Sequence, residues 1–574
     1  MPRSNDEVAE LLQEYADLIS ISGGDATKAR AYEKASRSVG GHHGDVERLD
    51  DKGLLAISNV GSSIARKIRE YLDTGAIAAL EDLRGEIPEG VRSLISIPGL
   101  GPKRAMLLHR ELEIGSVQEL LDALESGRLT GLTGFGPKTE ENLRRGIRLM
   151  QSSGDRILLG VAAGIAEEIL GELRENEAVE RADVAGSLRR MRETIGDIDL
   201  LVASERPSQV MDAFTALSGV DRVMARGTTK SSIVTTRGLQ VDLRVVEPKV
   251  WGAALQYFTG SKAHNVHVRE IAVRKGLKLS EYGLFRTKSG KLVVAETEEE
   301  VYERLGLPWI APTLREDRGE IQAALAGELP VLVEEKDIKG DLHTHTDLTD
   351  GLATLEQMVE AAQGRKLKYY AVTDHAELLS MQRMTRQKML AQRKRLERLQ
   401  RSTDMTLLHG TELNIQPDGS VDWDEDFLSG FDVCVASIHS HFTMSKDDMT
   451  RRLITAMEHP AVNIIGHPTT RKIGAREPIE LDFEEVCKAA ARTGTALEIN
   501  SYPDRLDLKD EHVAWARKHG VRFAIDTDSH STLHLPHLRF GVATAQRGWV
   551  EKAEVINAWP LSKLRRFLDK GRRR

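Results

Sequence analysis

Cysteine, aromatic residues and long apolar runs are all scarce in this sequence. The 574 residues include two cysteines, Cys434 and Cys487, which excludes a disulfide framework and favours a reducing compartment. No apolar run approaches the roughly twenty residues that a membrane-spanning helix needs. The N-terminal stretch MPRSNDEVAELLQEYADL carries acidic residues where a signal peptide would be apolar. We therefore expect a cytoplasmic protein without a membrane partner.

An excess of positive charge is missing as well. The formal net charge is −8, so a polyanionic partner must be bound by local basic patches rather than by the whole surface. The composition, 40% hydrophobic and 29% charged, is that of a soluble globular protein. The length predicts about three or four domains.

Three stretches near the N-terminus resemble one another: ISNVGSSIARKIREYL (57–72), ISIPGLGPKRAMLLHREL (95–112) and LTGFGPKTEENLRRGI (132–147). Each combines an apolar segment, a turn with glycine and a helix with basic residues, so unpaired amides at the helix start can bind phosphate. Plain helix packing is the alternative, but three copies favour helix-hairpin-helix motifs that hold a DNA backbone. Asn59 replaces the usual first glycine, which predicts a weaker contact there. The expected contact residues are Gly61, Gly99, Gly101, Gly134 and Gly136.

Two carboxylates lie in the stretch GSLRRMRETIGDIDLLV (186–202). Asp197 and Asp199 share a strand face, and QVDLRVV supplies a third carboxylate, Asp242. Two carboxylates about 4 Å apart repel by about 4 kcal/mol at an effective dielectric of 20. Divalent Mg²⁺ or Mn²⁺ would remove that cost. The alternative is that the carboxylates cap turns or pair with nearby arginines, namely Arg189, Arg190 and Arg244.

A phosphate-binding turn precedes these carboxylates. Gly186 and Ser187 offer backbone amides and a hydroxyl, and Arg190 adds a charge. A phosphate cradle beside a two-metal site is the apparatus of phosphoryl transfer.

This region resembles the family X DNA polymerases, the polymerase beta-like nucleotidyltransferases, over residues 1–318. YFTGSKAHNVHVR (257–269) and SEYGLF (280–285) extend the likeness, while Met191 and Gln240 depart from the animal enzymes. The resemblance implies that Asp197, Asp199 and Asp242 bind Mg²⁺ or Mn²⁺ and that Gly186, Ser187 and Arg190 hold the triphosphate. It also implies that Tyr257, Phe258 and Gly260 flank the sugar, Asn265 contacts the base edge and Arg269 the template side.

TKARAYEKA and SSIARKIREYL resemble the small N-terminal lyase domain of the same family. Lys67 would align with the Schiff-base lysine, supported by Lys28 and Tyr32, but Ser63 stands where a phosphate-binding lysine is common. We favour a DNA contact for Lys67 over a catalytic role.

A second cluster of ligand-type residues begins with GDLHTHTDLTDG (340–351). From residue 339 onward apolar strands alternate with charged helices, which predicts a β/α barrel, and nearly every strand ends in histidine or acid. Catalytic groups gather at the carboxyl ends of barrel strands. Metal binding is therefore favoured over nine separate structural roles for His343, His345, Asp350, His375, Glu412, His439, His467, Asp528 and His530.

The order of these residues resembles the PHP (polymerase and histidinol phosphatase) domain over residues 338–574. The likeness implies up to three Mn²⁺ or Zn²⁺ ions and phosphoester hydrolysis. It places His343, His345, Glu412 and Asp528 on one ion, lets Glu412 bridge to a second with His439 and His467, and gives a third to Asp350, His375 and His530. A basic stretch, 381–401, is either a DNA contact or a solvated helix face.

We therefore expect a multidomain chain, α+β and α/β, with a helical N-terminal region, a nucleotidyltransferase palm, an α+β nucleotide-binding subdomain and a distorted β/α barrel. Its function would be gap-filling DNA repair synthesis with a 3′–5′ exonuclease, acting on DNA and deoxynucleoside triphosphates as a monomer. The alternatives are a nuclease whose palm only positions DNA and a non-catalytic DNA scaffold with structural metals. The expected segments are lyase-like 1–85, hairpin 86–152, palm 153–250, subdomain 251–318, linker 319–338 and barrel 339–574.

Overall fold

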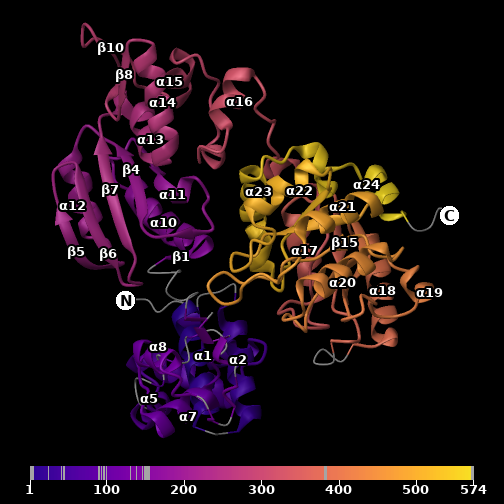
Figure 1. The fold of residues 1–574 in the computed structure, drawn as a ribbon. Coiled ribbons are helices and arrows are strands. Elements are labelled where there is room, and N and C mark those ends of the chain that lie inside the picture. Colours follow the sequence, from indigo (N-terminus) through magenta and orange to yellow (C-terminus); the bar gives the residue numbers. More distant parts are fainter. Residues whose placement is uncertain are drawn as a thin grey trace.

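A computed structural model describes most of the chain. The described residues are 5–22, 25–40, 42, 46–87, 91, 94, 97, 100–129, 131–132, 134–136, 139–141, 143–144, 146–147, 156–379 and 384–570. In Figure 1 the helical N-terminal region lies below, two α/β units lie on the left and above, and a barrel lies on the right. Within the described residues, no helix combines the length and apolar character needed to cross a bilayer.

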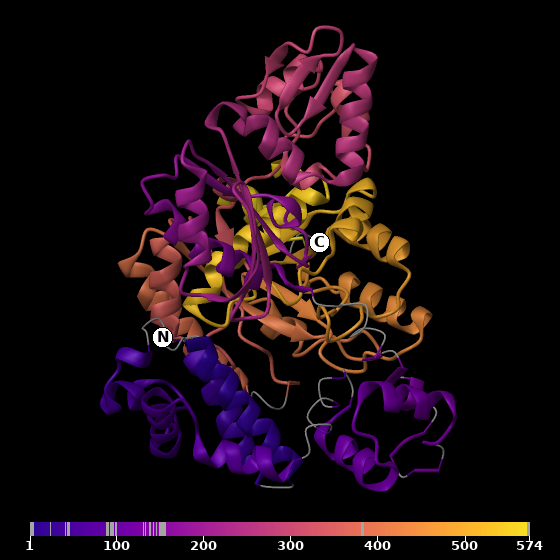
Figure 2. The ribbon, with the colours of Figure 1, turned by 90° about the vertical axis from the view of Figure 1, so that its left-hand side faces the viewer.

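The N-terminal region is helical, as expected. Apolar residues from all of its helices form one hydrophobic core, in which Leu12, Ile68 and Leu120 are completely buried. Figure 2 shows this region beneath the rest of the molecule. Its helices are α1 (Asn5–Ile21), α2 (Ala26–Gly40), α3 (Asp51–Ala56), α4 (Ser62–Thr74), α5 (Ala78–Glu86), α7 (Pro102–Leu112) and α8 (Val117–Glu125).

A five-stranded sheet forms the next unit, the five-stranded domain. Its strand order is β2-β4-β7-β6-β5, and β4 runs parallel to β7. Alternation along β4 buries both faces: Leu200 and Val202 pack with α10 and α12, whereas Leu201 and Ala203 pack with α13. The elements are α10 (Leu159–Arg174), β2 (Arg181–Val184), α11 (Gly186–Arg189), β4 (Ile198–Ala203), α12 (Pro207–Thr215), β5 (Val220–Arg226), β6 (Lys230–Thr235) and β7 (Gln240–Val246). The short strands β1 (Ile157–Leu158) and β3 (Thr194–Ile195) pair separately.

A small antiparallel sheet with helices follows, the three-stranded subdomain. Its strands β8 (Leu277–Ser280), β9 (Gly283–Arg286) and β10 (Leu292–Val294) pack with α13 (Trp251–Thr259), α14 (Lys262–Arg274) and α15 (Glu298–Arg304). The segment expected as a linker carries α16 (Glu320–Ala326). Glu320 at its start is fully buried, lies 2.7 Å from Nδ1 of His264 and accepts from the amide of Arg318 at 2.7 Å. This segment is therefore packed onto the subdomain.

The C-terminal unit is a parallel barrel. Seven strands follow in chain order, and a bridge between Thr344 and Ser529 links the ends of the first and the last. Along β14, Val433 and Val435 point into one hydrophobic cluster, and Cys434 points into another that includes the surrounding helices. The strands are β11 (Gly340–Asp341), β12 (Tyr369–Val372), β13 (Thr406–Asn414), β14 (Val433–Ser437), β15 (Ile464–Ile465), β16 (Ala496–Asn500) and β17 (Phe523–Asp526).

Helices cover the outside of the barrel. They are α17 (Leu355–Gly364), α18 (Arg386–Leu399), α19 (Glu425–Leu428), α20 (Lys446–Glu458), α21 (Phe483–Thr493), α22 (Asp510–Lys518), α23 (Leu538–Arg547) and α24 (Leu561–Leu568). Both cysteines are buried and free, which confirms that no disulfide joins them. The expected fold class is confirmed in all its parts: a helical region, mixed α/β units and a β/α barrel.

The five-stranded domain packs directly on the barrel. Leu506 and Phe540, both of the barrel, belong to the hydrophobic core of that domain. Ion pairs cross the same boundary, including Arg471 with Glu193 at 2.8 Å and Arg539 with Glu167. The barrel is thus continuous in packing with the five-stranded domain.

Candidate active sites

The first site lies where β4 and β7 run side by side. Asp199 and Asp242 are direct partners in the parallel register, and Asp197 immediately precedes β4. Burial, with the charges of Asp197 and Asp242, raises the pKa of Asp199 to about 6. Three carboxylates therefore meet at one strand end, and a cation placed there would relieve their repulsion.

A lysine already contacts one of these carboxylates. Nζ of Lys230 lies 2.8 Å from Asp242, and Gln240 donates to the same side chain at 2.9 Å. Burial alone would raise the pKa of Asp242, but hydrogen bonds from Lys230, Gln240 and Ser232 outweigh it and lower the pKa. Neither contact was anticipated from the sequence: pairing of β6 with β7 brings Lys230 to the aspartate, and Gln240 lies two residues before Asp242 on β7 itself.

The arginines considered as partners of the aspartates lie elsewhere. Arg189 pairs with Glu298 at 2.8 Å, Arg190 with Glu316 at 3.1 Å, and the guanidinium of Arg244 lies 4.5 Å from the ring centroid of Phe258. Within the described residues, none of these arginines forms an ion pair with the three aspartates. The three arginines therefore do not pair with the carboxylates, although Lys230 pairs with Asp242.

The predicted phosphate cradle adjoins the carboxylates. Gly186 has φ +56°, and a Cβ there would collide with the carboxylate of Asp199, so glycine is required. Ser187 is half-buried in the same turn. Met191 adopts φ +53°, the left-handed conformation that a glycine would favour.

Arg190 joins this cradle to the subdomain. Its Nη1 donates to the carbonyl of Thr259 at 2.6 Å, beside Gly260. The rings of Tyr257 and Phe258 meet edge to face at 5.2 Å. The expected nucleotide-binding side chains on α13 thus lie next to the cradle.

Asn265 is buried, and its side chain already has partners within the fold. Its Nδ2 donates to the carbonyl of Tyr257 at 2.7 Å, and its Oδ1 accepts from Gln256 at 2.8 Å. Arg269 lies one helical turn further along α14 and donates to the carbonyl of Asn265. These contacts fix the side-chain amide of Asn265 within the subdomain.

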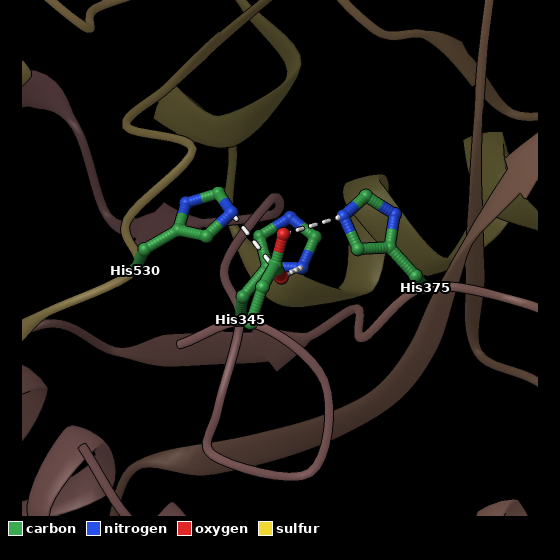
Figure 3. A group of neighbouring side chains, drawn as sticks. His345, His375 and His530 are labelled. Carbon is green, nitrogen blue, oxygen red and sulfur yellow. Dashed lines mark ion pairs between the residues drawn. The ribbon is translucent and has the colours of Figure 1, made fainter. Parts of the chain in front are cut away.

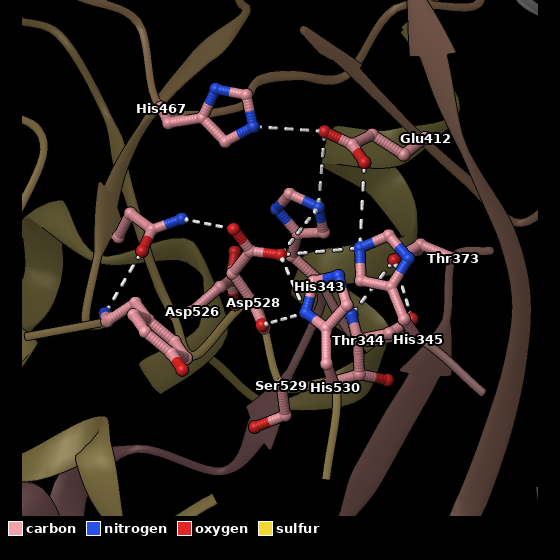
Figure 4. Close-up of polar contacts among 12 residues, drawn as sticks. His343, Thr344, His345, Thr373, Glu412, His467, Asp526, Asp528, Ser529 and His530 are labelled. Carbon is pink, nitrogen blue, oxygen red and sulfur yellow. Dashed lines mark hydrogen bonds and ion pairs between the residues drawn. The ribbon is translucent and has the colours of Figure 1, made fainter. Parts of the chain in front are cut away.

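The second site gathers all nine predicted ligand residues at the carboxyl ends of the barrel strands. Figure 3 shows the rings of His345, His375 and His530 turned toward one point, and Figure 4 shows Glu412 and Asp528 between further histidines. Ligand atoms converge within 4.8 Å in three groups: His345, Asp350, His375 and His530; His343, His345 and Asp528; His375, Glu412 and His439. Nε2 of His467 lies 3.1 Å from Glu412.

Several of these ligand atoms are buried without a hydrogen bond to any described residue. They are Nε2 of His343, both ring nitrogens of His345 and Oδ1 of Asp350. A buried polar atom without a partner is costly, and a metal ion would supply the missing partner. The mixture of imidazole and carboxylate donors suits Mn²⁺ or Zn²⁺.

Burial and neighbouring charges shift the pKa values of the side chains in this cluster. Burial would raise the pKa of Glu412, but His439, His375 and His343 together lower it well below its ordinary value. Burial lowers the pKa of His467 to about 3, so that imidazole is neutral and can act as a ligand.

Two residues that the sequence did not single out hold the ligands in place. Glu498 is fully buried, with Oε1 lying 2.6 Å from Nδ1 of His343 and Oε2 accepting from the amide of His467 at 2.5 Å. Asn500 donates to Asp528 at 3.0 Å. Such partners orient metal-ligating side chains.

Asp374 has a different role from its neighbour His375. Its carboxylate accepts from the amide of Thr346 at 2.8 Å and from the hydroxyl of Thr349 at 2.5 Å. It therefore fixes the loop that carries Asp350.

The helix-hairpin-helix turns expose their backbones. Gly61 and Gly101 cap α4 and α7, and a Cβ at Gly61, Gly101, Gly134 or Gly136 would meet nothing within 4 Å. Asn59 has φ +63°, so it adopts the conformation of the glycine that it replaces. Gly99 lies outside the described residues.

Lys28, Tyr32 and Lys67 lie together around Tyr15, a residue that the sequence did not single out. Nζ of Lys67 is 5.5 Å and Nζ of Lys28 5.7 Å from the Tyr15 ring centroid, and Tyr32 meets that ring edge to face at 4.7 Å. Lys28 and Tyr32 line a groove of about 780 Å³ that reaches Gly61.

The basic helix α18 is tied into the barrel. Arg386 pairs with Asp424 and Arg395 with Glu356, both at 2.6 Å, and Arg393 donates to His409. Residues 381–383 lie outside the described residues. These pairings favour a structural role for the three arginines.

Four family models match parts of the chain. A helix-hairpin-helix domain matches residues 3–77, a SAM-like helix-hairpin-helix tandem 91–148, the DNA polymerase beta thumb 254–316 and the PHP domain 341–502. These matches cover each unit except the five-stranded domain.

Curated relatives match the chain as a whole or in part. DNA polymerase/3'-5' exonuclease PolX of Bacillus subtilis (strain 168) is 35% identical over 569 residues, 98% of this chain and 99% of its own length. DNA polymerase lambda of Rattus norvegicus is 25% identical over 343 residues, 54% of this chain and 56% of its own. A probable phosphatase of Thermoanaerobacter sp. (strain X514) is 27% identical over 248 residues, 41% of this chain and 96% of its own. The chain therefore belongs to the family X DNA polymerases that carry a C-terminal PHP domain.

Proposed function

We propose that this family X polymerase extends DNA primers at the palm carboxylates and shortens 3′ ends at the histidine-rich site of its PHP barrel. The observation that carries the proposal is the presence of two separate clusters, Asp197, Asp199 and Asp242 in one domain and nine ligand residues in another. The full-length similarity to a polymerase/3'-5' exonuclease supports both activities. Gap filling during DNA repair is the setting that such a pair of activities fits.

In the palm, Asp197, Asp199 and Asp242 would hold Mg²⁺ or Mn²⁺. Bound there, the metal would lower the pKa of the primer 3′-hydroxyl and neutralise charge on the triphosphate. Gly186 and Ser187 would present the backbone turn to the phosphates. The raised pKa of Asp199 supports this assignment: burial is its main cause, and the neighbouring charges of Asp197 and Asp242, which a cation would balance, add to it.

Arg190 would bind the triphosphate directly. Its guanidinium lies between the cradle and Gly260, and its Nε and Nη1 are held by Glu316 and Thr259. Tyr257, Phe258 and Gly260 would flank the sugar, Asn265 the base edge and Arg269 the template side. The buried, hydrogen-bonded amide of Asn265 supports a fixed surface for the incoming nucleotide.

In the barrel, the three groups of converging ligand atoms would hold up to three Mn²⁺ or Zn²⁺ ions. Metal bound there would supply an activated water and stabilise the leaving oxygen of the phosphodiester. His345 and His375 each belong to two of the three groups, and Glu412 lies within 3.5 Å of His343, His345, His375, His439 and His467. Glu412, with two carboxylate oxygens, would be the side chain best placed to bridge ions.

The N-terminal region would bind the DNA backbone around a gap. Exposed turns at Gly61, Gly101, Gly134 and Gly136 support phosphate contacts, and deoxynucleoside triphosphates would be the second substrate. The protein would act as a monomer, with the domain boundaries expected from the sequence. Lys67, beside Lys28 and Tyr15, would contact the 5′ end of the gap.

A primer–template assay tests the whole proposal. With nucleotides and Mg²⁺ the protein should extend the primer, and without nucleotides in Mn²⁺ it should shorten the primer from its 3′ end. A protein that extends but never shortens DNA with any divalent metal would leave the barrel as a structural domain.

A further inference from the structure

A buried chain of alternating charges joins the barrel to the nucleotide-binding face of the palm. Arg547 is the last residue of α23 and is only 6% exposed. Its Nε and Nη2 donate to Asp510 of the barrel at 3.0 and 2.8 Å. Its Nη1 crosses the boundary, donating to Glu316 at 3.0 Å and to the main-chain carbonyl of Arg190 at 2.8 Å.

Glu316 carries the chain of charges onward to the side chain of Arg190. The Nε of Arg190 donates to the same oxygen of Glu316 that Arg547 contacts, at 3.1 Å. The side chains of Arg190 and Glu316 are 13% and 11% exposed. Burial would raise the pKa of Glu316, but Arg190, Arg547 and Arg192, whose Nη1 lies 3.9 Å from the same oxygen, outweigh it and lower that pKa, so Glu316 is ionised among three cations.

Because Arg190 shares Glu316 with Arg547, part of the Arg190 guanidinium remains available to bind an anion. Nε and Nη1 of Arg190 are engaged, whereas its Nη2 makes no hydrogen bond or ion pair with any residue that the structure describes. Without Arg547, the carboxylate of Glu316 would be free to form a two-point pair with Arg190, which is the stronger geometry for arginine and carboxylate. The partly buried main-chain carbonyl of Arg190 would also lose its donor.

We propose that Arg547 is a positioning residue for nucleotide binding: a barrel side chain that holds Arg190 in place and shares Glu316, so that Arg190 can bind the triphosphate. The inference rests on the proposed role of Arg190. It means that the PHP domain contributes to the polymerase reaction as well as carrying its own site.

Full-length Arg547→Ala tests the inference in single-nucleotide insertion on a gapped primer–template. We expect the KM for the deoxynucleoside triphosphate to rise about tenfold, the effect of about one lost charged contact, with a much smaller change in kcat. Primer shortening in the absence of nucleotides should stay within about twofold of wild type, since Arg547 lies outside the metal cluster. If Arg547→Ala does not fold, Arg547→Gln replaces it with the same expected rise.

Arg539→Ala is the matched control. Arg539 lies on the same helix and pairs across the same boundary with Glu167, away from Arg190. An unchanged KM in folded Arg547→Ala, or an equal rise in Arg539→Ala, would overturn the inference. Arg190→Ala distinguishes failure of this inference from failure of the proposed function. An unchanged KM in Arg190→Ala would mean that Arg190 does not bind the triphosphate.

Discussion

Glu498 and His343 form a buried pair at the heart of the barrel, with Oε1 2.6 Å from Nδ1 and both side chains fully enclosed. The second oxygen of Glu498 accepts from the amide of His467. One carboxylate therefore orients two candidate metal ligands, which follow the separate strands β11 and β15.

Replacing Glu498 should damage the exonuclease alone. Loss of a partner that orients a metal ligand typically lowers metal affinity or activity about 10- to 100-fold, so Glu498→Gln should slow primer shortening by that factor. Higher Mn²⁺ should restore part of the rate, and insertion of nucleotides should be unaffected. Glu484→Gln, an exposed acid on α21, is the control. If Glu498→Gln shortened primers at the wild-type rate, Glu498 would have no orienting role.

The palm carboxylates should be indispensable for synthesis but not for DNA binding. Asp197→Ala and Asp242→Ala should abolish insertion, because each removes a ligand of the two-metal site, while the hairpin turns still hold the DNA backbone. Insertion and gel-shift measurements check this, with Asp212→Ala on α12 as the control. Residual synthesis above about a tenth of wild type would contradict the two-metal assignment.

Asp199 should make the metal-free protein less stable as the pH rises. Its folded-state pKa of about 6 exceeds the ordinary 3.8, so its ionisation costs stability that accumulates between about pH 4 and pH 6. Without divalent metal, Asp199→Asn should therefore be more stable than wild type at pH 8, by about 1 to 3 kcal/mol, and equally stable at pH 4. Denaturant unfolding at both pH values measures this. Mg²⁺ should stabilise wild type more than the variant, and equal stability at pH 8 would refute the penalty.

Lys67 should act as a DNA contact. Lys67→Ala should weaken binding to gapped DNA in a salt-dependent way, as expected for one lost phosphate contact, whereas Lys52→Ala on α3 should not. Borohydride treatment on an incised abasic site should trap no adduct with wild type. A trapped adduct that disappears in Lys67→Ala would instead establish the Schiff-base role.

Many residues of both sites could be predicted, because the ends of strands can be recognised from the local sequence. His343, Glu412 and Asp528 each belong to or follow an apolar strand, and the parallel barrel brings such ends together. Asp197 and Asp199 share one short stretch, so their proximity followed from strand periodicity. The roles of the other site residues were inferred from the resemblance to the two families.

Long-range partners could not be predicted in this way. Glu498 meets His343 across 155 residues, and Arg547 meets Arg190 across 357. Nothing in the stretch TALEIN distinguishes an orienting acid from a solvent-facing one. Contacts between domains depend on packing that no local pattern encodes.

Two variants measured side by side test the central claim that the chain carries two independent active sites. Primer extension with nucleotides and primer shortening without them should be followed on the same gapped DNA for His343→Ala and Asp242→Ala. The account predicts that His343→Ala extends primers at the wild-type rate but does not shorten them, and that Asp242→Ala does the reverse. Shortening by His343→Ala as fast as wild type, or loss of both activities in either folded variant, would contradict it.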